Sequence, residues 1–161
     1  MVHLPPPVHG AALRNESLVK SELLNAHFNI KIHPLSFAKS IDDIGSVSIG
    51  KLIKAGIYAA RLLWYMLMFR PRIAYFTIAP VGGAFYRDVL FVIILKFFPA
   101  KIVYHLRGMG IRGAMTGGLK SALYRFVFRN TDVICLSSLQ LADISLVRYD
   151  RLFIVPNGIK I

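Results

Sequence analysis

Acidic residues are scarce in this sequence. Only 8 of the 161 residues are Asp or Glu, against 20 Lys and Arg, so the formal net charge at pH 7 is +12. No cluster of carboxylates suits a hard metal ion, and we expect neither a metal nor a cofactor. The excess of positive charge indicates an anionic partner, for which nucleic acid, a phosphorylated sugar and an acidic lipid all qualify.

Cysteine and long apolar runs are also nearly absent. Cys135 is the only cysteine and stands in an apolar strand pattern, so an internal disulfide is excluded and a role as a small core residue is favoured. The first residues, MVHLPPPVHG, lack the basic start and the apolar stretch of a signal peptide. No uncharged run approaches the roughly 20 residues of a spanning helix. We therefore expect a protein of the reducing cytoplasm.

What the sequence does contain is an alternation of strand and helix patterns over its whole length. Strands are predicted at 1–4, 29–34, 73–78, 101–106, 132–137 and 152–155, and helices at 11–27, 49–69, 84–98, 119–129 and 139–147. This alternation is typical of right-handed crossovers and a parallel sheet. The prediction is one α/β domain, a three-layer α/β/α sandwich with a mostly parallel sheet of about six strands.

The segment from Lys101 to Gly113, KIVYHLRGMGIRG, is the strongest candidate for a site. A short apolar strand ends there in His105 and a glycine-rich loop, and ligands of open α/β sheets bind at the carboxyl ends of strands. An imidazole at that edge can serve as a hydrogen-bond partner or as a base near neutral pH. Gly10 would open a helix at the same edge and suit a phosphate, although an ordinary helix start explains it equally well.

The sequence disfavours dinucleotide binding and nucleic-acid binding. Gly108, Gly110 and Gly113 spell GxGxxG, but this motif follows the fourth strand, and Asp132 lies at the wrong end of the next strand to bind a ribose. Nucleic acid is not expected as a partner, because neither a recognition module nor interleaved aromatic residues accompany the basic residues. Weak attachment to an anionic membrane through the apolar helix around 89–95 fits the charge better.

Four motifs bring a known family into view. They are PPPVHGAALRN at 5–15, YHLRG at 104–108, TDVICLSS at 131–138 and VPNGI at 155–159. In order and spacing the chain resembles the N-terminal half of a GT-B fold glycosyltransferase of the retaining family 4 type (group 1), as found in bacterial surface polysaccharide assembly. The resemblance implies that 1–161 is one Rossmann-like, acceptor-side domain, half of a GT-B fold, without the C-terminal donor-binding domain.

This resemblance implies transfer of a hexosyl group from a nucleotide-sugar donor to a glycan or lipid-linked acceptor, at the inner face of the membrane. The donor would be held mainly by the missing domain, so the chain alone is expected to be inactive. By analogy His105 is the catalytic candidate. The implied substrate-binding residues are His9, Gly10, Arg14, Arg107 and Gly108, and the implied hinge residues are Pro156, Asn157 and Gly158.

The chain departs from the family pattern at two positions. Arg107 stands where a second histidine is frequent, and Lys160 stands where an aspartate commonly follows the proline-asparagine-glycine motif. Because the expected second domain does not follow Ile161, two alternatives stay open: a stand-alone binding module, or a subunit that a separate chain completes. A domain that exposes its cleft face is also open to self-association through that apolar surface.

Overall fold

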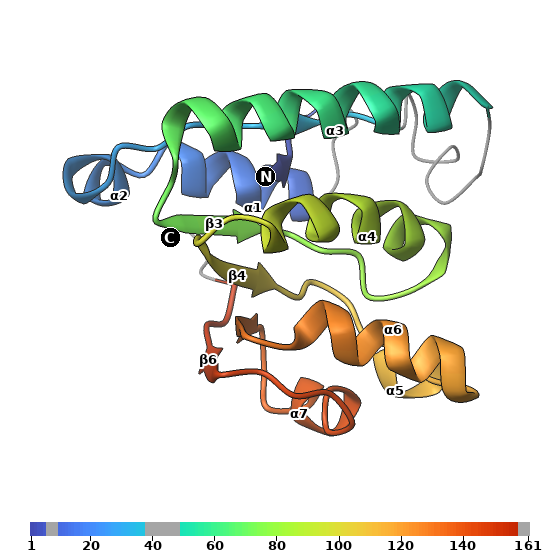
Figure 1. Ribbon diagram of the computed structural model, residues 1–161. Helices are drawn as coiled ribbons and strands as arrows, with labels where there is room; N and C mark the ends of the chain where they lie inside the picture. Colours follow the sequence, from blue (N-terminus) through green and yellow to red (C-terminus); the bar gives the residue numbers. More distant parts are fainter. Residues whose placement is uncertain (6–9, 38–48, 158–161) are drawn as a thin grey trace.

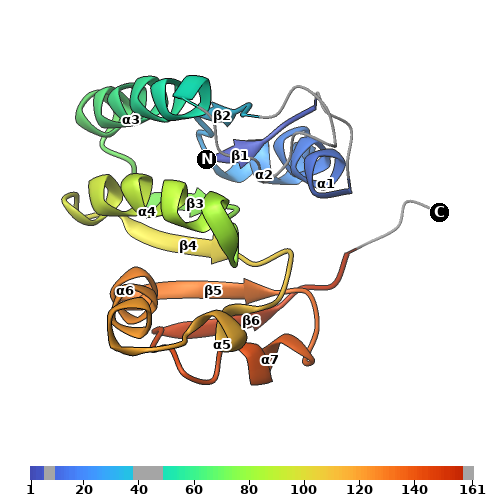
Figure 2. The same ribbon diagram turned by 90° about the vertical axis from the view of Figure 1, so that its right-hand side faces the viewer.

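The chain forms an α/β structure around a parallel sheet. The computed structural model describes residues 1–5, 10–37 and 49–157. Four strands pair in the order β3-β4-β5-β6, and all are parallel. They are β3 (Ile73–Phe76), β4 (Lys101–His105), β5 (Thr131–Cys135) and β6 (Arg151–Ile154). Their carboxyl ends therefore share one edge of the sheet, as the arrowheads of β4 and β5 show in Figure 2, and the predicted α/β class is confirmed.

Two short strands form a separate parallel pair, β1 (Val2–His3) and β2 (Pro34–Leu35). The pair lies alongside β3, because the Met1 amino group donates to the Tyr75 carbonyl oxygen at 2.5 Å and the Thr77 N–H donates to the Met1 carbonyl oxygen at 3.2 Å. The strand predicted at 29–34 is wrong for all but its last residue. Pro34 has no N–H to donate, which limits the ladder that this segment can form.

Seven helices join the strands within the described ranges: α1 (Gly10–Val19), α2 (Glu22–His27), α3 (Ile49–Phe69), α4 (Gly82–Lys96), α5 (Ile111–Ala114), α6 (Gly118–Phe128) and α7 (Gln140–Asp143). The predicted bounds of α3 are confirmed, whereas the helix predicted at 11–27 is broken. Ser21 is extended and its Oγ accepts a hydrogen bond from the Leu24 N–H at 3.4 Å, so a new helix begins there. The helix predicted at 139–147 is limited to α7.

One face of the sheet packs on α4 and α6. Phe76 of β3 meets Phe91 of α4 edge to face, and Tyr104 of β4 meets Phe128 of α6 in the same way. The Tyr104 hydroxyl also donates to the Val127 carbonyl oxygen at 3.1 Å. In Figure 1 both helices lie on the same side of the strands. The main hydrophobic core lies between these two layers.

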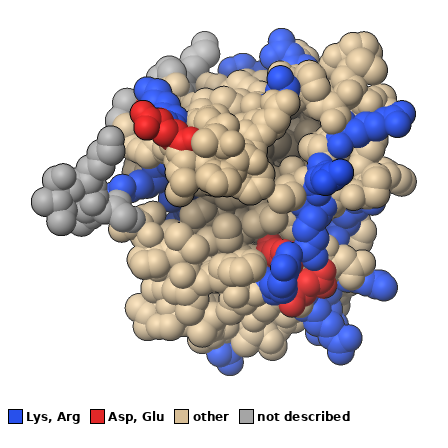
Figure 3. All heavy atoms as spheres, turned by 90° about the vertical axis from the view of Figure 1, so that its left-hand side faces the viewer, with Lys and Arg blue, Asp and Glu red and all other residues tan. Residues whose placement is uncertain are grey.

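The opposite face is less covered. Alternation along β3 turns Tyr75 and Thr77 to this side, where Thr77 meets α1. Farther along the sheet, Ile73 and Phe153 remain 51% and 44% exposed. Figure 3 looks at the molecule from the left of Figure 1 and shows Lys and Arg gathered along one side of a surface that is largely uncharged. The carboxyl edge of the sheet is the place where ligands of parallel α/β sheets bind, so the candidate site is expected there.

Candidate functional site

His105 closes strand β4 and lies buried against Tyr75 of β3. Its Nδ1 is 2.6 Å from the Tyr75 hydroxyl, and the two rings meet edge to face with centroids 5.9 Å apart. The register pairs Tyr75 with Val103, two residues before His105, so alternation puts both side chains on the same face. Only 6% of His105 is exposed. The predicted catalytic candidate is thus held in one orientation at the carboxyl edge.

The surroundings of His105 keep its imidazole neutral. Burial, and secondly the charge of Arg107, lower its pKa from 6.5 to about 4. Burial also raises the pKa of Tyr75, while the nearby charge of Arg107 opposes that rise. The His105 Nε2 is buried and has no hydrogen-bond partner among the described residues. A neutral ring with one unused nitrogen can bind a hydroxyl group by a single hydrogen bond.

Arg107, two residues beyond the end of β4, connects this pair to the end of the described chain. Its guanidinium Nη1 donates to Asn157 Oδ1 at 3.2 Å. Its Nε is buried and lacks a hydrogen-bond partner within the described ranges. Asn157 follows β6 by three residues. The segments after β4 and after β6 therefore meet at one place on the edge.

Thr77 brings α1 to the same edge. Its Oγ1 donates to Asn15 Oδ1 at 3.1 Å, and both side chains are buried. Three hydrogen-bonded pairs thus lie at this edge: Asn15 with Thr77, Tyr75 with His105, and Arg107 with Asn157. We call this set the edge network: Asn15, Thr77, Tyr75, His105, Arg107 and Asn157.

Asp143 at the end of α7 occupies the glycine-rich loop. Its carboxylate accepts hydrogen bonds from the backbone N–H groups of Gly110, Ile111 and Arg112, at 2.9, 3.1 and 3.1 Å. These are the N–H groups at the start of α5, the kind of donors that cradle a phosphate in dinucleotide-binding proteins. An internal carboxylate already uses them, so the GxGxxG spacing here belongs to a structural turn.

Gln140 at the start of α7 ties the same loop to β5. Its Nε2 donates to the Gly108 carbonyl oxygen at 3.0 Å, and its Oε1 accepts from the Leu136 N–H at 2.5 Å. Both ends of the amide are therefore engaged within the protein. We call Gly108, Gly110, Ile111, Arg112, Gln140 and Asp143 the glycine-loop cluster.

Three other predicted substrate-binding residues lie in α1 and in the segment after β4. Gly10 is exposed as the first residue of α1, and Arg14 is half-buried one turn later. Gly108 follows Arg107 and packs against Pro80, where an added Cβ would lie 3.1 Å from the proline Cγ. Close packing thus explains this glycine without a ligand.

The predicted hinge begins directly after β6. Pro156 and Asn157 are exposed there, and Asn157 contacts Arg107 as described. His9 and Gly158, the remaining predicted site residues, lie outside the described residues. The sequence motifs did not identify Tyr75, Thr77 or Asn15 as site residues. The alternation of Tyr75 and Thr77 at the end of a predicted strand was a usable signal for the first two.

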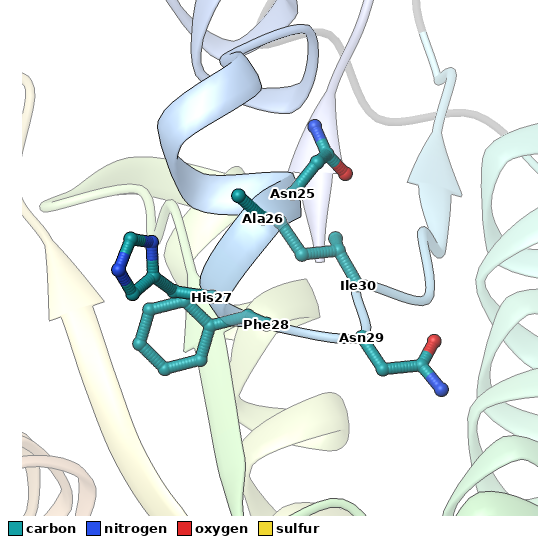
Figure 4. Close-up of a pocket in the computed structure, with 6 residues that line it drawn as sticks. All are labelled: Asn25, Ala26, His27, Phe28, Asn29 and Ile30. Atoms are coloured by element: carbon teal, nitrogen blue, oxygen red, sulfur yellow. The ribbon is translucent and has the colours of Figure 1, made fainter.

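An open hollow of about 430 Å³ lies elsewhere, at the end of helix α2 and in the turn that follows it. Six consecutive residues line it, Asn25 to Ile30, and none of them belongs to the edge network. Figure 4 shows the His27 and Phe28 rings side by side and the Asn25 and Asn29 amides on separate sides of the turn. The hollow brings no group of converging polar side chains together, so it is a weaker candidate than the edge network.

Metal and thiol chemistry find no site in the described part of the chain. Within residues 1–5, 10–37 and 49–157, no group of three or more His, Cys, Asp or Glu side chains could hold a metal ion. Cys135 is buried in β5, and burial raises the pKa of its thiol. As predicted from the sequence, it is a core residue.

No family model, no curated protein and no solved structure matches this chain. The four sequence motifs and the geometry of the edge network are therefore the features that bear on the function of the chain.

Proposed function

We propose that the chain is the acceptor-side domain of a GT-B fold, family 4 type glycosyltransferase. The observation that carries the proposal is the contact between Arg107 and Asn157, beside His105. These residues come from two of the motifs that carry the resemblance, YHLRG and VPNGI, which lie about 50 residues apart in the chain. Asn15, the last residue of the first motif, reaches the same network through Thr77.

The fourth motif, TDVICLSS, supports the proposal by its position. It contains β5, which pairs with β4, and the Leu106 N–H donates to the Ile134 carbonyl oxygen at 2.9 Å. The motifs that are distant in sequence are thus neighbours in space. Residues that bind one ligand from several strand ends are expected to converge in this way.

We also propose that the domain is a Rossmann-like α/β/α sandwich, one half of a GT-B fold. The hydrogen bonds of Met1 support an order β2-β1-β3-β4-β5-β6, in which the direction of chain progression reverses between β1 and β3. Ligands of such sheets bind at the carboxyl ends of the strands beside this reversal. The contact between Asn15 and Thr77 lies there.

The reaction breaks the bond from the sugar's anomeric carbon to a donor phosphate oxygen and forms a bond from that carbon to an acceptor hydroxyl oxygen. The nucleotide diphosphate leaves with the electron pair of the broken bond, and its phosphate oxygen takes up the proton of the hydroxyl. With a pKa of about 4, His105 is a poor base at neutral pH. Its Nε2 is better suited to a hydrogen bond with a sugar hydroxyl, which orients the ring for transfer. Arg107 adds positive charge where an anionic donor would approach.

In this proposal the predicted hinge residue Asn157 has a physical role. Asn157 lies where the chain would leave the first domain, and its side chain accepts a hydrogen bond from Arg107. A ligand that binds Arg107 would compete for this contact. Closure of a second domain over the edge would then depend on whether the site is occupied.

The test is sugar transfer by the protein encoded by the complete native gene. The assay measures transfer and hydrolysis with a panel of uridine and guanosine diphosphate sugars and lipid-linked acceptors. Replacing His105 with Ala is expected to lower kcat by a factor of about 10² or more, since it removes a positioned hydrogen-bond donor. His27→Ala is the matched control, because His27 is exposed on α2 and bonds only locally, to the Leu23 carbonyl oxygen.

Two outcomes would contradict the proposal in different ways. Absence of transfer and hydrolysis with every donor would remove the transferase function, and unchanged turnover in His105→Ala would remove only the role of His105. The alternative, a binding module or a subunit completed by a separate chain, draws support from Phe153 and Ile154, which are 44% and 49% exposed. A native reading frame that stops after codon 161 would favour that alternative.

A further inference from the structure

Helix α3 presents its large apolar side chains outward. The residues that it buries are Ala55, Ala59, Leu62 and Met66, which recur along one face. The opposite face carries Ile53 (61% exposed), Ile57 (48%), Trp64 (61%) and Met68 (55%). We call these four residues the α3 stripe. Their spacing of four, seven and four residues keeps them in line along the helix.

Only basic charges accompany the α3 stripe. The sequence of α3, IGKLIKAGIYAARLLWYMLMF, contains no Asp or Glu. Lys54 and Arg61 are seven residues apart, two turns of helix, and follow Ile53 and Ala60 on one border of the stripe. Arg61 is exposed and Lys54 half-buried. An apolar stripe with a cationic border is the surface that an anionic bilayer attracts and then embeds.

The stripe is turned away from the rest of the domain. In Figures 1 and 2 α3 lies along the outer edge of the molecule, with α4 on its inner side. By length and composition, Leu52–Phe69 is apolar enough to cross a membrane, and 22% of this segment is buried. Leu62 and Met66 nevertheless belong to the main hydrophobic core. A helix anchored to the core by one face lies on a bilayer rather than through it.

The membrane contact predicted around residues 89–95 falls on α4, where Leu90 and Ile93 are each 40% exposed. In α4 the residues Val89, Phe91, Val92 and Leu95 are all buried against the core. Helix α3 therefore exposes a larger part of its apolar side chains than α4 does. Periodicity alone could not reveal this, because both helices are rich in apolar residues on more than one side.

We propose that α3 docks the domain on an anionic membrane surface. The α3 stripe enters the boundary between headgroups and acyl chains, and Lys54 and Arg61 pair with lipid phosphates. Each cationic side chain of the border that reaches the headgroups increases the affinity of the domain for an anionic membrane. The proposal does not depend on sugar transfer, so the two can fail separately.

A second copy of the chain is a less suitable occupant of this surface. A two-fold symmetric dimer would place the same patch of both copies face to face. Lys54 and Arg61 would then face the equally cationic α3 of the other copy, which has no carboxylate to neutralise them. A bilayer containing acidic phospholipid supplies both the apolar interior and the negative charge.

The chain carries its own probe for the test. Trp64 is the only tryptophan in the sequence and belongs to the α3 stripe, so its fluorescence reports directly on this surface. We expect a blue shift of its emission on adding vesicles with about 30% phosphatidylglycerol, quenching by lipids brominated near the headgroup, and flotation of the protein with the vesicles. Pure phosphatidylcholine vesicles should bind it at least about tenfold more weakly.

Two variants with matched controls separate the apolar and the charged contributions. Ile53→Ser with Ile57→Ser should weaken vesicle binding by about tenfold or more, whereas Leu119→Ser, at an 88% exposed position on α6, should not. Lys54→Gln with Arg61→Gln should weaken it to a similar extent. The control Lys120→Gln with Arg125→Gln removes the same charge from exposed positions on α6 and should have a much smaller effect.

Three results would overturn the proposal. One is unchanged Trp64 emission on vesicles that do bind the protein, which would place the contact elsewhere. Another is an equal loss of binding in both charge variants, which would leave only a general attraction of the +12 chain. The third is a concentration-dependent blue shift without vesicles, together with a dimeric mass in light scattering, which would assign the stripe to a second copy.

Discussion

Two groups of residues at the carboxyl edge differ in how many of their buried polar atoms have hydrogen-bond partners. In the glycine-loop cluster, the Asp143 carboxylate takes up three backbone N–H groups, and both ends of the Gln140 amide are bonded. In the edge network, His105 Nε2 and Arg107 Nε are buried and lack partners among the described residues. A satisfied cluster stabilises the fold, whereas buried polar atoms without partners cost free energy and call for an explanation.

The structure changes which of the two sequence motifs is the better candidate for a binding site. GxGxxG is the more familiar motif, yet it is the part whose donors are already occupied. YHLRG is the less specific pattern, yet His105 Nε2 and Arg107 Nε are buried without a hydrogen-bond partner among the described residues. The glycine-loop cluster therefore fixes the loop that follows Arg107 to α7. Stability and ligand binding should respond to changes in different groups of residues.

The largest effect on stability is expected from Asp143→Ala. The change leaves the N–H groups of Gly110, Ile111 and Arg112 without their acceptor, and we expect a loss of about 3 kcal/mol or more in the free energy of unfolding. Urea denaturation followed by circular dichroism measures it. Asp143→Asn keeps the shape and one acceptor oxygen, so it should lose about half as much. A neutral result for both variants would mean that the cluster does not stabilise the loop.

Gly110→Ala should have the next largest effect. Gly110 has a φ of +120°, and an added Cβ would lie 3.0 Å from Val81 Cγ1. The left-handed backbone and the close contact together should cost about 2 kcal/mol. Gly113→Ala is the matched control, because Gly113 lies in α5 with nothing within 4 Å of the added Cβ. It should be neutral or slightly stabilising in the same denaturation experiment, and equal losses in both variants would refute the backbone argument.

The smallest of the three effects concerns the pH dependence of stability through His105. Its folded pKa of about 4 lies below the ordinary 6.5, so below pH 6.5 the unfolded chain binds a proton that the folded chain refuses. This contribution to stability is complete above pH 6.5 and is lost as the pH falls towards 4. It should amount to at most about 2 kcal/mol between pH 7 and pH 5.

His105→Asn is the variant that isolates this contribution, since an amide can still bond to Tyr75. Other buried groups titrate in the same range. Burial lowers the pKa of His33, which acts in the same direction, and raises the pKa of Asp88 to about 6, which stabilises the fold as the pH falls. Both proteins retain these groups, so the difference between their denaturation curves at pH 7 and pH 5 reports His105. Parallel curves would show that His105 is not held neutral.

Local pattern was sufficient to predict most of the fold. Helix α3 ends at Phe69, as expected from Pro71, which disfavours helical geometry at the residue before it. The four strands of the main sheet begin within one residue of their predicted positions. The break at Ser21 was missed, because the apolar positions of α1 and α2 form one continuous pattern although a serine caps the second helix.

The candidate site was predicted in part, for a reason of sequence distance. His105, Arg107 and Asn157 stand in recognisable motifs and do meet at the edge. Tyr75 lies 30 residues from its partner His105, and Asn15 lies 62 residues from Thr77. Asp143 lies more than 30 residues from the backbone groups it accepts from. No local spacing encodes such pairs, because they depend on which strands become neighbours.

The sequence by itself determined the order of the four main strands, the parallel sheet and the cationic character of the chain, because periodicity, turn residues and charge are local properties of a chain. Only the tertiary structure decided which glycine-loop donors are occupied, which buried polar atoms lack a partner among the described residues and which helix displays its apolar face. These outcomes depend on packing between distant segments. In α3 the alanines Ala55 and Ala59 face the core and Trp64 faces outward, a choice made by the space that the neighbouring elements leave.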